Sequence, residues 1–140
     1  MRVYLDSSVI VPLVTLDPFN DRVDAFLQNV QPVVIVSDFA SAEVSSAIAR
    51  RVRTGDLTRN EARMAFANLD AWVQQQARRV VLENPDVSLA EQFVRRLDSN
   101  LRAPDAIHIA VAIRLSLTLV SLDGAMRAAA QRLGCPVIEP

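Results

Sequence analysis

The segment Val3-Tyr4-Leu5-Asp6-Ser7-Ser8, near the start of the chain, decides the fold, because there an apolar run ends in a carboxylate. Residues 2–5 predict a short buried strand, and Ser7 and Ser8 predict the cap of a helix that runs to about residue 15. Open α/β sheets bind their ligands at the carboxyl ends of such strands. Asp6 is therefore a candidate site residue.

Strands and helices are predicted to alternate along the rest of the chain. We expect strands at 33–36, 79–82, 118–121 and 136–138, the last at a sheet edge. We expect helices at 20–30 and from residue 37 or 38 to about 55. A further helix follows a capping box at 58–61, and another spans about 88–97 beyond a turn at 84–86. The last two helices begin at residue 104 and span about 124–133. This alternation predicts one α/β domain, residues 1–140, with three α/β/α layers around a mostly parallel sheet of four to five strands.

Composition narrows the class of protein. With 51% hydrophobic and 22% charged residues over a length of 140, the chain is globular, and its net charge of −1 does not by itself attract nucleic acid. The sequence contains no lysine, which excludes P-loop and Schiff-base chemistry. A single cysteine, no signal-peptide pattern and no long apolar run predict a cytoplasmic protein without a membrane span.

Four acids lie beside apolar segments, where burying a charged carboxylate costs free energy. Asp6 ends the first strand, Glu43 lies in an apolar helix, Asp105 opens the apolar segment 106–113, and Asp123 follows the strand that ends at Ser121. If the first and fourth strands are neighbours, these acids meet at one sheet edge. Two unit charges 4 Å apart repel by about 4 kcal/mol at an effective dielectric near 20. Either some pKa values rise or a cation enters, and a set of oxygen ligands alone suits Mg²⁺ or Mn²⁺.

Each acid also has a structural explanation. The helix dipole favours a carboxylate at Asp105, Asp123 can cap the last helix, and Glu43 can pair with Arg50 or Arg51. Asp6 is the hardest to explain in this way, because apolar residues precede it.

Other residues invite weaker functional readings. His108 follows Asp105 by three positions, but its apolar helix favours a packed, hydrogen-bonded histidine over a metal ligand. Asp38 and Asp98 are expected to be a helix cap and a loop residue, and Trp72 and Phe66 to pack in the core or a dimer rather than to stack on bases.

With these features the chain resembles a PIN domain, and in particular the small VapC-type toxins of bacterial toxin–antitoxin pairs. The matching segments follow one another in family order over nearly the whole chain: Val3-Tyr4-Leu5-Asp6-Ser7-Ser8, Ser41-Ala42-Glu43-Val44, Pro104-Asp105-Ala106-Ile107-His108-Ile109-Ala110, Leu119-Val120-Ser121-Leu122-Asp123 and Leu133-Gly134-Cys135-Pro136-Val137-Ile138.

The resemblance implies a Mg²⁺- or Mn²⁺-dependent endoribonuclease whose metal is held by Asp6, Glu43, Asp105 and Asp123, the last being the most variable of the family's acids. Ser121, and with it Ser7, is placed to hydrogen-bond an acid or a metal-bound water. The resemblance further implies a cognate antitoxin, a homodimer and a structured RNA substrate such as transfer RNA. The apolar stretch 9–14 would serve as the dimer seam or the antitoxin groove.

RNA phosphates need local arginines in a chain of this charge. Arg102, near the expected metal site, is the main candidate, and Arg50 and Arg51 at a helix end are the others. Two alternatives to a ribonuclease remain open. One is a PIN-like module that only binds a partner. The other is a haloacid-dehalogenase-like phosphatase, which is disfavoured because Ser8 stands where such enzymes have a second aspartate.

Overall fold

The structure, a computed structural model that describes residues 1–140, is built on a single five-stranded sheet. The strands are β1 (Arg2–Leu5), β2 (Val33–Ser37), β3 (Ala77–Val80), β4 (Thr118–Val120) and β5 (Val137–Ile138), in the spatial order β3-β2-β1-β4-β5. Every pairing is parallel, with Tyr4 aligned with Ile35 of β2 and with Leu119 of β4. The predicted strand number, the parallel sheet and the edge position of the last strand are therefore confirmed.

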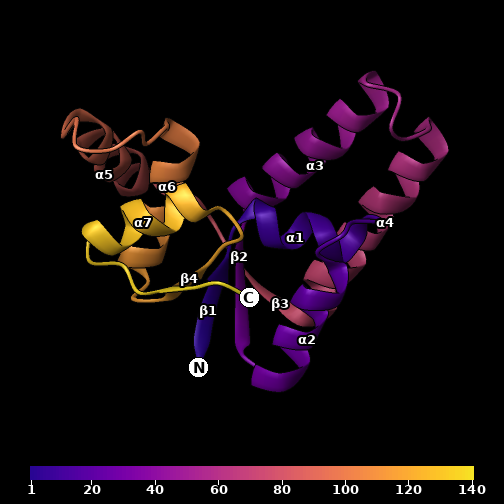
Figure 1. The fold of residues 1–140 in the computed structure, drawn as a ribbon, viewed down its shortest axis with the longest axis horizontal. Coiled ribbons are helices and arrows are strands. Elements are labelled where there is room, and N and C mark those ends of the chain that lie inside the picture. The colour runs from indigo at the N-terminus through magenta and orange to yellow at the C-terminus, as the bar shows by residue number, and fades with distance from the viewer.

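Seven helices cover the two faces of the sheet (Figure 1). One face carries α1 (Ser7–Val14), α2 (Asn20–Val30), α3 (Asp38–Arg53) and α4 (Arg59–Gln76), and the other carries α5 (Asn84–Arg95), α6 (Ala103–Arg114) and α7 (Gly124–Arg132). Helices α3 and α4 form an antiparallel arm that extends beyond the sheet. No helix has the length and apolar character needed to cross a membrane.

Side chains on β1 alternate between two apolar cores, as the period of a strand requires. Val3 and Leu5 pack with α1 to α4, whereas Tyr4 packs with α6 and α7. Helix α1 lies within the first core, with Val9, Ile10, Pro12 and Val14 buried. Packing inside this chain thus accounts for the apolar character of residues 9–14, which we had attributed to a seam with another chain.

Three local predictions were wrong. The cap of α1 is Asp6, which accepts a hydrogen bond from the backbone N–H of Val9, rather than Ser7 or Ser8. Strand β3 starts and ends two residues earlier than 79–82, because α4 passes directly into it and pairing with β2 sets its register. The expected turn at 84–86 is the first turn of α5, where Glu83 and Asp86 form a capping box that tolerates the intervening proline.

Candidate functional site

Asp6 lies at the centre of the carboxyl edge of the sheet. Its backbone N–H continues the β1–β4 ladder by donating to the carbonyl of Val120 (3.3 Å), so the two central strands end side by side as predicted. Its carboxylate is almost fully buried and accepts hydrogen bonds from Ser8 Oγ (2.6 Å), Ser121 Oγ (2.6 Å) and the backbone N–H of Val9 (3.3 Å). Burial raises the pKa of Asp6, although Ser121 and Ser8 oppose the effect.

Two serines connect the carboxylate of Asp6 to the backbone that follows β4. Ser121 Oγ, which donates to Asp6, also accepts from the backbone N–H of Asp123 (3.0 Å). Ser8 Oγ in the same way accepts from the N–H of Leu122 (2.9 Å). The carboxylate of Asp6 is therefore tied to the backbone after β4 through both hydroxyls. Ser121 has the role that we predicted for it, and Ser8 shares that role although only its capping potential was visible in the sequence.

Asp105 and Asp123 come from the first turn of α6 and from the cap of α7. Asp123 Oδ1 accepts from the backbone N–H of Met126 (3.1 Å), so its capping role is realised. Asp105 is half-buried, with Arg102 Nε 3.9 Å from its Oδ2. Burial raises the pKa of Asp105, the negative charge of Asp123 raises it further, and Arg102 opposes both. Asp105 and Asp123 are thus near enough for the charge of Asp123 to act on Asp105.

Glu43 on α3 is held by the histidine of α6. His108 Nε2 contacts Glu43 Oε1, and Arg51, which we had considered as a partner of Glu43, instead pairs with Asp17 (3.2 Å). Burial works to raise the pKa of Glu43, but the hydrogen bond from His108, with smaller contributions from Ser7 and Arg102, lowers it overall. His108 itself is buried, as predicted for a packed histidine.

Each of the four acids is engaged by partners of its own. No group of three or more histidine, cysteine, aspartate or glutamate side chains is arranged to hold a metal ion. Each of the four acids nevertheless offers carboxylate oxygen, the ligand type that suits a hard divalent cation.

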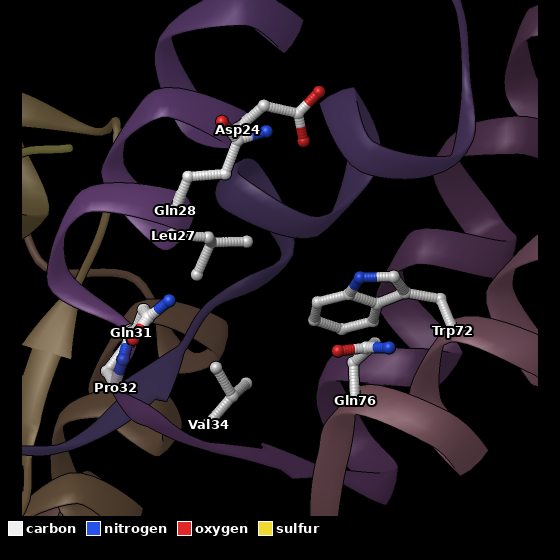
Figure 2. Close-up of a pocket in the computed structure, with 8 residues that line it drawn as sticks. All are labelled: Asp24, Leu27, Gln28, Gln31, Pro32, Val34, Trp72 and Gln76. Carbon is white, nitrogen blue, oxygen red and sulfur yellow. The ribbon is translucent and has the colours of Figure 1, made fainter.

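Two hollows border this acidic cluster. One, of about 160 Å³, is lined by Asp105 together with Asn100, Leu101 and Arg132. The other, of about 380 Å³, is lined by Asp123 and by Ser7 and Ser8 of α1. A third cavity, of about 370 Å³, lies between α2 and α4, where Leu27 and Trp72 face each other among glutamines (Figure 2). This cavity contains none of the four acids and opens near the start of β2, at the opposite end of the strands.

The remaining predicted residues are distributed over the surface and the core. Arg102 is 81% exposed beside Asp105, whereas Arg50 and Arg51 lie about two turns beyond Glu43 on the α3 arm. Asp98 is a loop residue paired with Arg96 (3.2 Å). Ser37, rather than Asp38, caps α3, and Asp38 instead accepts from the N–H of Leu82 (2.8 Å). Phe66 and Trp72 pack against the first core as partly buried residues.

Comparison with known proteins identifies the class. The model of the PIN domain family matches residues 3–132. Ribonuclease VapC46 of Mycobacterium tuberculosis is 36% identical over 99% of this chain and 97% of its own length. The chain belongs to the PIN domain family.

Solved structures show the same fold. The crystal structure of Mycobacterium tuberculosis VapC20, a sarcin-ricin-loop-cleaving toxin, superposes with a TM-score of 0.74 at 20% identity, covering 91% of this chain and 95% of that one. VapBC2 of Rickettsia felis, solved bound to a DNA fragment from its promoter, gives a TM-score of 0.70 at 12% identity over 99% and 98% of the two chains. Because the chain belongs to the PIN domain family, the alternative of a haloacid-dehalogenase-like phosphatase was wrong.

Proposed function

We propose that this PIN-domain protein is a divalent-metal-dependent endoribonuclease and the toxin of a toxin–antitoxin pair. The observation that carries the proposal is the buried carboxylate of Asp6 at the carboxyl ends of the two central strands, tied through Ser121 to the backbone of Asp123. A relative with 36% identity over nearly the full length, named as a ribonuclease, supports the reaction class.

We assign Asp6, Glu43 and Asp105 as the principal ligands of Mg²⁺ or Mn²⁺, with Asp123 as a fourth acid whose Oδ1 already caps α7. When bound, such an ion lowers the pKa of a water molecule and neutralises charge on the phosphate that this water attacks. Ser121 holds Asp6 by the hydrogen bond described above, and Ser7 lies near Glu43. These hydroxyls keep the acids in place while the substrate binds.

Arg102 is our proposed RNA contact, because its guanidinium is exposed and lies next to Asp105. A phosphate bound there would lie close to the acids. Arg50 and Arg51 are weaker proposals, since Arg51 already pairs with Asp17. We propose that a structured RNA, such as a transfer RNA loop, binds over the two hollows beside Asp105 and Asp123.

The proposed partners are a cognate antitoxin and a second copy of this chain. Leu16 is fully exposed and Phe19 is 45% exposed between α1 and α2, and Phe19 lines the hollow beside Asp123, which leaves an apolar surface for a protein partner. Light scattering that shows a monomer at high protein concentration would contradict the homodimer.

We further propose that residues 1–140 act as one domain in the cytoplasm, where RNA is accessible.

The decisive experiment is RNA cleavage with Mn²⁺ by the wild-type protein and by Asp6→Asn. Cleavage should be lost in Asp6→Asn and retained in Asp70→Asn, which changes an exposed acid on α4. Unchanged cleavage by a folded Asp6→Asn protein defeats the assignment. Absence of Mg²⁺ or Mn²⁺ binding at millimolar concentration would instead favour a PIN domain that only binds a partner.

A further inference from the structure

A line of buried polar side chains runs under the acidic cluster from β2 through β1 to α6. Tyr4 Oη lies 2.7 Å from Ser37 Oγ and 2.8 Å from His108 Nδ1, and all three residues are at most 1% exposed. The line begins at the backbone N–H of Ala40, which donates to Ser37 Oγ (3.0 Å), and ends where His108 Nε2 contacts Glu43. None of the buried side-chain nitrogen or oxygen atoms lacks a partner.

The two ends of this line limit the hydrogen-bond directions between them. A backbone N–H can only donate, and an ionised carboxylate can only accept. His108 Nε2 must therefore carry the hydrogen that points to Glu43. If Tyr4 donates to His108 Nδ1 and Ser37 donates to Tyr4, each group along the line gives one hydrogen bond and receives one.

The ring of His108 is also clamped on its faces. The Tyr4 ring lies 5.7 Å from it, centroid to centroid, and the Phe39 ring lies 5.1 Å from it, both at tilted angles. An imidazole held in this plane presents a fixed donor to one oxygen of Glu43, and it leaves the second oxygen of that carboxylate to a cation.

We propose that His108 is a positioning residue for Glu43, held by Tyr4 and Ser37 as a hydrogen-bond donor that orients this carboxylate toward the metal. The inference rests on the proposed function, because it treats Glu43 as a metal ligand. Hydrogen-bond partners of metal ligands commonly account for about 10- to 100-fold of metal affinity.

The first test uses the fact that the chain has one histidine and one tyrosine. In the metal-free wild-type protein, ¹⁵N NMR of the imidazole should show a hydrogen on Nε2, the nitrogen that faces Glu43. In Tyr4→Phe the ring loses the donor to Nδ1, and the spectrum should show a mixture of tautomers. A wild-type spectrum with no hydrogen on Nε2 overturns the proposal.

The second test measures Mn²⁺ binding by calorimetry in His108→Leu, His108→Gln and a control, Ser45→Ala, whose hydroxyl bonds only to its own helix. His108→Leu should weaken binding about 10- to 100-fold. His108→Gln should recover much of the affinity, because its amide N–H can donate to Glu43 from a similar place, and Ser45→Ala should bind like the wild type.

The outcomes separate this inference from the proposed function. A folded His108→Leu protein that binds Mn²⁺ as tightly as the wild type, or a glutamine variant no better than leucine, overturns the positioning role while leaving the metal site intact. A wild-type protein that neither binds Mn²⁺ nor cleaves RNA overturns both. If His108→Leu does not fold, the tautomer spectra and the Mn²⁺ affinity of Tyr4→Phe, expected to fall in the same direction, decide the matter.

Discussion

Replacing Asp6 by asparagine should separate metal binding from folding. The carboxylate of Asp6 accepts three hydrogen bonds, from Ser8, Val9 and Ser121. Asparagine keeps an acceptor for Ser8 and Val9, and it presents an amide N–H to Ser121, whose hydroxyl can rotate to accept it. The loss is then the difference between charged and neutral hydrogen bonds, about 1 kcal/mol for each bond.

The substitution also removes a buried carboxylate whose pKa is raised by burial, because its charged form is costly to bury. Removal of this cost offsets the weaker hydrogen bonds. We therefore expect the unfolding free energy of metal-free Asp6→Asn to lie within about 1 kcal/mol of that of the metal-free wild type.

The assay is thermal unfolding with and without Mn²⁺. At 100 times its dissociation constant, the ion stabilises the wild-type protein by about 2.7 kcal/mol. For a domain of this size that corresponds to a rise in Tm of roughly 10 °C. Asp6→Asn should show only a small fraction of this rise, and Asp70→Asn should show all of it. An equal metal-induced rise in Asp6→Asn, or a metal-free variant several kcal/mol less stable, would refute the reasoning.

Three further predictions follow from the same contacts. Because burial raises the pKa of Asp6 above its ordinary 3.8, the stability that this group contributes is present below that value and is lost as pH rises through the folded pKa. Metal-free wild-type protein should thus lose unfolding free energy relative to Asp6→Asn as pH rises above about 4 in urea titrations. Asp86 is buried and accepts from two N–H groups of Arg114 (2.6 and 2.9 Å), so Asp86→Ala should lower the unfolding free energy by about 3–5 kcal/mol, and a loss below about 1 kcal/mol would contradict that role. Arg102→Ala should weaken RNA binding and reduce its salt slope by about 1, whereas Arg95→Ala, which removes only a surface pair on α5, should leave the slope unchanged.

Much of the fold is visible in local sequence. The strand at residues 2–5 and the helix at 20–30 were placed correctly, because burial, turn residues and helical periodicity agree there. The cap of α4 by Thr58 was also correct, since a capping box involves residues only three positions apart. The start of α5 was missed because Asn84 and Pro85 suit a turn as well as a first helical turn, and only the reciprocal bonds of the cap distinguish the two.

The sequence by itself determined which residue types stand at the ends of the central strands, because an acid after a buried apolar run is a local pattern. The order of the strands decided which of these acids become neighbours, and it placed β1 between β2 and β4. The partner of Glu43 was likewise a tertiary matter. Nearby arginines on α3 were expected, yet His108, 65 positions away, holds it, because the packing of α6 over β1 and α3 brings a buried donor to that carboxylate. Local propensity carries no information about such contacts, since they depend on how the layers assemble.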